Sequence, residues 1–304
     1  MSLTLLEAAK LVQDPLQRGV IEIFPRVSPV LERLPFFNVT GQAYKYNQEQ
    51  TLPGIAFRGI NESYTESTGV VNPCVEALYV LGGISYVDRA LVKTQGNVND
   101  LRATYDAMKA KSAALEYTKK FFKGDNSTDP NEFDGLDERL TGDQKIAAGS
   151  TSGGDTLTTD MLDILIDAVQ GGPDVLFMNK TMRRKVSGLV RAAGQAIETV
   201  NDAFGRQLTA YAGVPLAVIE EDKDGNQILP FTEDNPGGGT AASTSIYAVR
   251  FGVVEYVSGL QAGPMDVLDL GLNRTNYETL IEWICGLGVF HPKAAARLYG
   301  VKNA

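Results

Sequence analysis

The sequence predicts an α+β protein in which an elongated two-layer domain carries an inserted α/β domain. Three patterns lead to this fold class: a helix over residues 99–123, a strand of alternating polarity over 277–289, and a block after residue 157 in which short helices and strands alternate. A helix rises about 1.5 Å per residue and a strand about 3.3 Å, so both long elements reach roughly 40 Å. Elements of equal length can pack as two layers along their whole extent.

The long helix is the clearest one in the chain. Its apolar positions recur at helical spacing and form a narrow stripe: Leu101, Tyr105, Met108, Ser112, Leu115 and Phe122. Asn99 can act as the N-cap, and Gly124 supplies the C-terminal stop. Because the stripe is narrow, we expect this helix to lie on a sheet with one face only.

The long strand near the C-terminus has strict period-two alternation. One face carries Tyr277, Thr279, Ile281, Trp283, Cys285, Leu287 and Val289. Glu278 and Glu282 point to the other face, which is typical of a half-buried antiparallel strand.

Residues 36–90 are expected to form an extended β-hairpin. Short strand patterns at 36–39 and 43–46 and a longer one at 75–93 flank a polar, turn-rich segment, Gln48 to Gly69. A hairpin of this length is marginal by itself and needs a partner surface. Before it, residues 3–12 favour a short helix, and a proline-rich apolar stretch up to residue 35 favours an extended arm.

The block after residue 157 predicts a compact α/β unit. Its expected elements are a helix from Leu157 to Ala168, a helix over 181–193 capped by Asn179, and strands at 175–178, 214–219, 245–250 and 252–257. The acidic segment starting at Glu220 resembles the beginning of a calcium loop. However, the twelfth position is Phe231 instead of a carboxylate, so a hairpin turn at Asp224-Gly225 is favoured.

Composition excludes several classes of protein. The formal net charge is -9 and the pI is about 4.8, and the densest basic run is only residues 182–185, so nucleic acid is not expected as the main target. Two separate cysteines predict neither a disulfide framework nor a zinc site, and they suit a reducing cytoplasm. No apolar run approaches the ~20 residues of a membrane span, and the N-terminus lacks a signal-peptide pattern.

No catalytic, cofactor-binding or metal-ligating residue is predicted. The only histidine, His291, stands beside a proline at a strand end, where a structural role is typical. There is no G-x-S-x-G motif, and the glycine-rich segments at 152–154 and 237–239 lack the Lys-Ser/Thr of a phosphate-binding loop. A hydrolase that uses His291 is kept as a minor alternative.

Taken in order, five segments resemble the major capsid protein of tailed bacteriophages, which has the Hong Kong 97-like fold. They are residues 19–22 leading to 34–36, residues 121–125 followed by the F-x-G-L turn at 133–136, residues 174–179, the G-x-P strand at 213–216, and the closing segment 289–295. Each segment is a weak indicator, but their order matches the order of parts in that family.

The resemblance implies an N-terminal arm at 1–35, an extended loop at 36–90, a peripheral domain at 91–150 and 253–285, and an axial domain at 151–252 and 286–304. It also implies a structural, non-enzymatic subunit that forms pentamers and hexamers in an icosahedral shell around double-stranded DNA. The extended loop would lie on the adjacent subunit, with Tyr46, Leu52, Phe57 and Arg58 as inter-subunit contacts.

Several partners follow from the same resemblance. The arm begins close to Met1, which predicts a separate scaffolding protein, and a portal and a decoration protein are also expected. Packaged DNA would be contacted only non-specifically, with no cofactor and no membrane, and the protein would be made in the bacterial host cytoplasm before entering the virion. An encapsulin-like shell of a cellular nanocompartment is the alternative. Lys45 lies near the hairpin base, so the lysine cross-link of some family members is not inferred.

Overall fold

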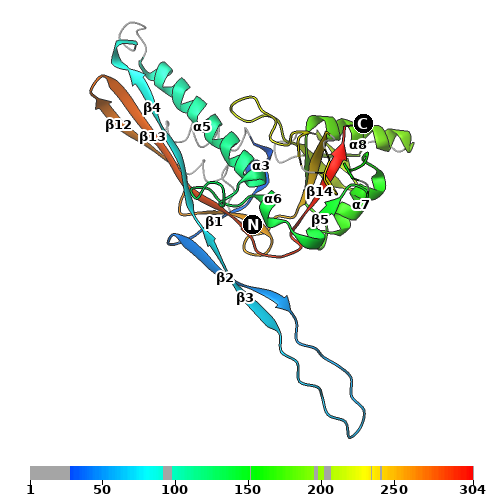
Figure 1. Cartoon of the computed structure of the whole chain (residues 1–304). Coiled ribbons are helices and arrows are strands. Elements are labelled where there is room, and N and C mark those ends of the chain that lie inside the picture. Colours follow the sequence, from blue (N-terminus) through cyan, green and yellow to red (C-terminus); the bar gives the residue numbers. More distant parts are fainter. Residues whose placement is uncertain are drawn as a thin grey trace.

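The computed structural model describes residues 28–91, 98–150, 152–194, 198–201, 207–233, 235–239 and 242–303. Within these ranges the chain forms an elongated sheet-and-helix body, a second body built on another sheet, and a hairpin that projects from between them (Figure 1). The helix predicted at 3–12 and most of the predicted arm lie outside the described residues.

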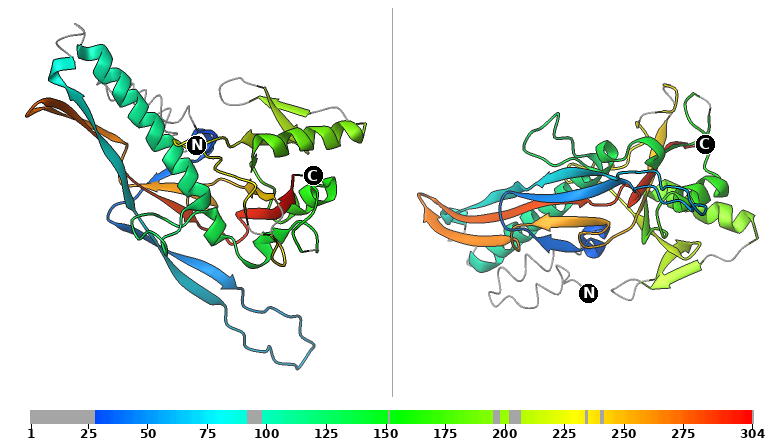
Figure 2. Two further views of the ribbon diagram at one scale, coloured as in Figure 1. Left: turned by 45° about the horizontal axis from the view of Figure 1, so that its top comes forward. Right: turned by 90° about the horizontal axis from the view of Figure 1, so that it is seen from below.

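The elongated body confirms the predicted pairing of a long helix with a long strand. Its described strands are ordered β1-β11-β13-β12, and β4 pairs with the other edge of β13. Their bounds are β1 (Phe36–Asn38), β4 (Tyr79–Asp88), β11 (Val257–Gln261), β12 (Asp266–Asn273) and β13 (Asn276–Val289). Helix α5 (Val98–Lys123) runs along one face of this sheet (Figure 2).

The alternation predicted for the long strand is present in β13. Ile281, Trp283 and Cys285 are buried on the side that faces α5, whereas Glu282 is exposed on the other side. Trp283 packs against Phe36 with ring centroids 5.1 Å apart, and its indole nitrogen donates a hydrogen bond to Gln261 Oε1 at 3.2 Å. Strand β13 is therefore the centre of the elongated body.

The apolar stripe predicted for α5 is wrong over its first half. Tyr105 and Met108 are exposed, and Ala110, Ala114 and Tyr117 are buried instead. Two alanines allow the sheet to approach the helix closely, so the packing selects the face with small residues over the face with larger apolar ones. The helix begins at Val98, so Asn99 lies inside it and is not the N-cap.

The strand predicted over 75–93 is two strands that serve different sheets. Strand β3 (Val70–Ala77) pairs with β2 (Ala43–Thr51) in the hairpin, and after Leu78 the chain continues as β4 along β13. Glycine is required at Gly82, because a Cβ there would lie 2.6 Å from the carbonyl oxygen of Ile281. This close approach explains the glycine in the middle of the predicted strand.

The second body is built on a sheet whose described strands are ordered β5-β14-β10-β6-β9-β8-β7. Their bounds are β5 (Lys145–Ala147), β6 (Val175–Met178), β7 (Glu198–Asn201), β8 (Gln207–Tyr211), β9 (Val214–Val218), β10 (Ser243–Val249) and β14 (Ala295–Lys302). Helices α7 (Thr159–Asp167) and α8 (Lys180–Ala192) pack on it, and the Asn179 side chain caps α8 as predicted. The α/β character of this part is confirmed.

One sequence expectation for the second body is wrong, and one of its strands was missed. Residues 253–256 form a turn, with Val254 at a φ of 57°, and the next strand starts at Val257 in the other sheet. Strand β14 was not predicted, because it is buried on both faces and so lacks the alternation that identifies a half-exposed strand. The turn expected at Asp224-Gly225 is present, with Gly225 at a φ of 81°.

Three short helical segments complete the described fold. They are α3 (Pro29–Arg33), α6 (Leu136–Arg139) and a 3-10 turn at Gly142–Gln144. The end of the predicted arm is therefore helical instead of extended: Ser28 caps α3, and Val30 and Leu31 are buried in the core. Among the described helices, none combines the length and apolar character needed to cross a membrane.

Candidate functional site

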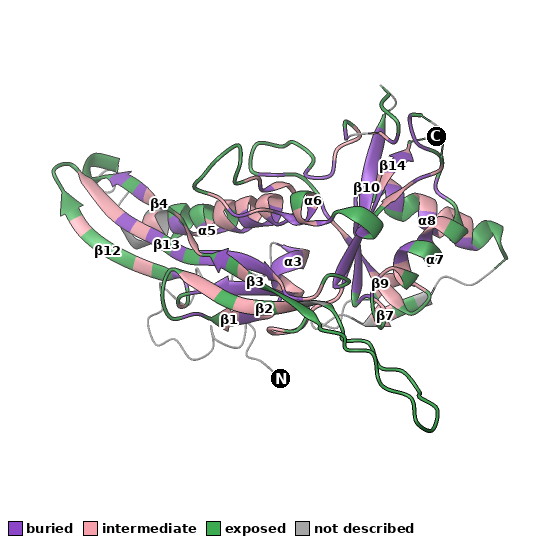
Figure 3. Cartoon of the chain, turned by 60° about the horizontal axis from the view of Figure 1, so that its bottom comes forward, coloured by how far each residue is buried: buried purple, intermediate pink, exposed green. Residues whose placement is uncertain are grey.

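The extended hairpin, residues 43–77, carries large apolar side chains that its own chain leaves exposed. Strands β2 and β3 pair from Ala43 opposite Ala77 to Thr51 opposite Val70, and residues 52–69 continue as a long loop beyond the strands. Figure 3 shows this loop exposed along its whole length. Its exposed apolar side chains are Leu52, Ile55, Phe57, Ile60 and Tyr64.

This apolar tip is not covered by its own chain. Ile55 is 98% exposed, and the whole segment 51–70 is exposed to solvent. Soluble monomers rarely display several large apolar side chains together on a projecting loop, and such a patch usually marks an interaction site. The tip is therefore suited to packing on another molecule.

The four predicted contact residues occupy two different places. Leu52, Phe57 and Arg58 lie in the exposed loop, where the Arg58 guanidinium sits 5.2 Å from the ring centroid of Tyr64 and donates to the Glu62 carbonyl at 2.9 Å. Tyr46 lies at the base of the hairpin and contacts its own chain. Their role between subunits stays a prediction.

An aromatic cluster holds the hairpin base against the body. The Tyr46 ring packs on Phe290 with centroids 4.7 Å apart, and Tyr44 contacts Phe290 at 5.8 Å. The Tyr46 hydroxyl lies within hydrogen-bond distance of two acceptors, the Val289 carbonyl at 3.1 Å and the Glu76 carboxylate at 3.3 Å. Burial, with the neighbouring Glu76 carboxylate as a second cause, raises the pKa of Tyr46 well above its usual value.

An ion pair fastens the other strand of the hairpin. Arg139 on α6 binds both carboxylate oxygens of Glu76 on β3, at 2.6 and 2.7 Å, and its Nε donates to the Asp134 carbonyl at 2.7 Å. Because Glu76 and Arg139 lie far apart in the sequence, no local spacing could have predicted this pair. A free tip on a fixed base gives the hairpin a defined direction.

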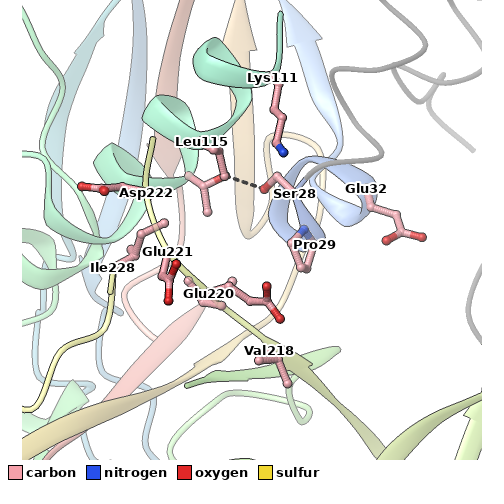
Figure 4. Close-up of a pocket in the computed structure, with 12 residues that line it drawn as sticks. Ser28, Pro29, Glu32, Lys111, Leu115, Val218, Glu220, Glu221, Asp222 and Ile228 are labelled. Carbon is pink, nitrogen blue, oxygen red and sulfur yellow. Dashed lines mark hydrogen bonds between the residues drawn. The ribbon is translucent and has the colours of Figure 1, made fainter. Parts of the chain in front are cut away.

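A cleft lies elsewhere, between α3, α5 and the segment after β9 (Figure 4). It has a volume of about 510 Å³ and is lined by both apolar and acidic side chains, among them Glu32, Glu220, Glu221 and Asp222. Asp222 is bound to Lys119 at 2.9 Å, and Glu220 to Lys180 at 2.7 Å. Two of the four carboxylates are therefore held in ion pairs.

The chemistry-bearing side chains weighed from the sequence have structural surroundings. His291 accepts a hydrogen bond at Nδ1 from the Lys293 backbone at 3.0 Å, and its ring faces Tyr256. Cys285 is fully buried, and burial raises the pKa of its thiol well above the usual value. In the part of the chain that the structure describes, no three His, Cys, Asp or Glu side chains are grouped to hold a metal ion.

Comparison with known proteins agrees with this geometry. The model of the family described as Major capsid protein GP7 matches residues 13–158, a range that includes the extended hairpin and α5. Residues 13–158 are therefore similar to major capsid proteins, and the fold of the chain is the Hong Kong 97-like fold. Its role is that of a structural shell subunit.

Solved structures extend the similarity over most of the chain. The SrpI encapsulin of Synechococcus elongatus PCC 7942 has a TM-score of 0.65 at 18% identity, covering 91% of this chain and 89% of that one. A structure of Microbacterium phage Oxtober96 has a TM-score of 0.61 at 13% identity, covering 90% of each chain. The capsid of a native GTA particle has a TM-score of 0.60 at 16% identity, again covering 90% of each. No curated protein matches the sequence.

Replacing Arg139 by methionine should loosen the hairpin base of the capsid protein. The Glu76 carboxylate would lose its bidentate partner in a partly buried site, which we expect to cost about 2–4 kcal/mol of unfolding free energy. Urea denaturation of the free subunit measures this loss. Lys180→Met is the matched control, because its pair with Glu220 is largely exposed and should be worth less than about 1 kcal/mol. Equal losses in the two variants would show that the base is not fastened by this pair.

A second stability prediction concerns Asp106, whose carboxylate is buried between α5 and the sheet. The residue is 1% exposed, and among the described residues neither oxygen has a hydrogen bond of good geometry. Burial is the main cause that raises the pKa of Asp106, and it outweighs the opposing effect of Ser85, Arg102 and Thr279. The folded state therefore binds the proton more tightly than the unfolded chain. Stability is consequently lost as the pH rises from the unfolded pKa through the folded one.

Asp106→Asn should therefore stabilise the subunit by about 1–3 kcal/mol at pH 7, because it removes the charge from a buried site. The gain should disappear below about pH 4, where the carboxyl is protonated in both states. Denaturation midpoints of both proteins across this pH range test the prediction. A destabilised Asp106→Asn variant at pH 7 would contradict it.

Proposed function

We propose that this protein is the major building block of an icosahedral phage head that encloses double-stranded DNA, assembling as pentamers and hexamers. The observation that carries the proposal is the extended hairpin, whose apolar tip has no cover in its own chain and whose base is fixed to the body. A fixed projection with an apolar end is what an adjacent copy in a closed shell can cover. Leu52, Phe57 and Arg58 would make that contact, and Tyr46 would support it from the base.

In the proposed domain organisation, residues 151–252 and 286–304 form an axial domain around the capsomer axis. Residues 91–150 and 253–285 would form the peripheral domain together with β1 and β4. Within the segment 36–90 the hairpin 43–77 would be the extended loop, and residues 1–35 would be the arm. The two sheets supply a physical basis for the two domains, since each has its own strands and the chain crosses between them repeatedly.

We further propose that assembly uses a separate scaffolding protein, a portal and a decoration protein, and that the subunit is made in the bacterial host cytoplasm. Packaged DNA would meet the shell without specific contacts, and the net charge of -9 supports this, because an acidic wall does not retain a polyanion. The role would need no cofactor.

An encapsulin-like shell is the second candidate, and the similarity to the SrpI encapsulin favours it. The two functions differ in content: a phage head holds DNA, and a nanocompartment would hold a protein cargo. Particles purified after nuclease treatment from the native producer separate them. Protected double-stranded DNA inside the particle supports the phage head, whereas a co-purifying enzyme without DNA supports the nanocompartment.

Negative-stain electron microscopy of the purified protein tests the shell function itself. We expect closed particles of uniform diameter, formed by the protein alone or with its scaffolding protein. A protein that stays monomeric in both conditions would contradict the proposal.

A further inference from the structure

Four charged side chains are gathered where the elongated body meets the second body. Lys123 is the last residue of α5, Asp137 lies on α6, Glu233 follows β9, and Arg297 lies on β14. Helix α6 lies at the junction of the two bodies in Figure 1. Two of the residues thus come from the side of the long helix and two from the side of the seven-stranded sheet. We call these four residues the junction quartet.

The junction quartet is closed and charge-balanced. Lys123 Nζ lies 2.5 Å from an Asp137 oxygen and 2.7 Å from a Glu233 oxygen, and Arg297 pairs with the same two carboxylates, at 3.2 Å for Glu233. Each cation therefore bridges both acids, and each acid bridges both cations. The Arg297 Nε also donates to the Ser245 hydroxyl at 2.9 Å, and this hydroxyl donates to Glu233.

Two members of the quartet are almost fully buried, and the other two, Lys123 and Asp137, are partly exposed. The side chains of Arg297 and Glu233 are 2% and 3% exposed, and the guanidinium lies near the rings of Tyr247 and Tyr299. Burial lowers the pKa of Arg297 to about 10, which still leaves it charged near neutral pH. Removing charged groups from water costs much of the free energy that their mutual attraction supplies. An ion-pair cluster therefore stabilises the fold little compared with apolar side chains of similar size.

Adhesion between the two bodies is already provided by apolar contact beside the quartet. Phe121 and Phe122 at the end of α5 pack on Phe177 of the second body, with centroids 6.2 and 5.4 Å from it, and Phe122 also contacts Tyr247. Apolar packing tolerates small rotations, whereas hydrogen-bonded ion pairs accept a narrow range of geometry. The ion pairs therefore restrict the relative orientation of the two bodies more than they strengthen the contact between them.

We propose that the junction quartet fixes the angle between the two bodies, and that this angle sets the curvature with which subunits join in the shell. The second half of this inference rests on the proposed shell function, and the first half concerns the free subunit alone. The four residues act as positioning residues for assembly, because they hold the two bodies in register.

The test replaces the quartet by apolar side chains: Lys123→Met, Asp137→Leu, Glu233→Met and Arg297→Met together. Spin labels at Met108→Cys on α5 and Arg184→Cys on α8, in a Cys74→Ser background, measure the distance between the bodies in the free subunit. We expect a folded subunit whose distance distribution is at least twofold broader than that of the unsubstituted chain. Particles should then vary in diameter or stay open in electron micrographs.

An exposed pair supplies the control, since Lys180→Met with Glu220→Met should leave both the distance distribution and the particles unchanged. Should the fourfold variant fail to fold, Arg297→Lys keeps the charge, loses the two-pronged geometry, and should still broaden the distribution. A sharp, unchanged distance together with uniform particles of normal diameter in the folded variant would overturn the proposal. If the unsubstituted protein formed no shell, the shell function would fail, and the distance measurement would still decide the role of the quartet.

Discussion

Exchanging Ile55, Phe57 and Ile60 for serine should abolish shell assembly and leave the subunit folded. All three side chains are almost completely exposed in the single chain, so their removal costs the isolated fold little. In the shell each would be buried on a neighbouring copy, which is worth about 1.5–3 kcal/mol per side chain, or roughly 5–9 kcal/mol per hairpin. At ~1.4 kcal/mol per factor of ten, the concentration needed for assembly should rise at least a thousandfold.

Sedimentation velocity of the serine variant measures this directly, with circular dichroism to confirm the fold. Ile164→Ser serves as the control, because this side chain is also exposed but lies on α7, away from the hairpin. Normal shells from the triple variant at the usual protein concentration would show that the tip does not make the contact on which assembly depends.

Truncating Trp283 to alanine should cause the largest loss of stability in the elongated body. The side chain is 1% exposed and packs between Phe36 and Tyr117, each with its ring centroid 5.1 Å away. Its removal leaves a cavity and deprives Gln261 of a hydrogen-bond donor, so we expect a cost of about 3–5 kcal/mol.

Urea denaturation of the free subunit checks this value, with Tyr86→Ala as the control. Tyr86 lies on β4 of the same sheet but is exposed, so its truncation should cost less than about 1 kcal/mol. A cost for Trp283→Ala that is no greater than for the control would mean that β13 is not the centre of the core.

The sequence predicted those elements whose environment has a regular period. Strand β13 alternates between buried and more exposed residues from Thr279 to Cys285, so its period could be recognised. The capping residue Asn179 could be identified from its place before a helix. The buried face of α5 could not be found in the same way. Large apolar residues such as Met108 remain exposed and small ones such as Ala110 are buried, because only the face with small side chains lets the helix pack closely on the sheet.

The candidate site, too, could be predicted only in part. A long hairpin that needs a partner surface could be predicted, and two of its expected contact residues, Leu52 and Phe57, are exposed at its end, although the segment was expected to be polar. The contacts that fix the direction of the hairpin could not be predicted, because Glu76 pairs with Arg139, and Tyr46 packs on Phe290, only after folding. Pairs of this kind depend on tertiary distance, and a single sequence carries no local pattern for them.

Hydrogen exchange of the hairpin loop tests the central claim most directly. The backbone amides of residues 52–69 should exchange rapidly in the free subunit, because this segment is exposed and lies beyond the paired strands. In assembled particles, the same amides should be protected by the neighbouring copy. Equally fast exchange of this segment in free subunits and in closed particles would contradict the account.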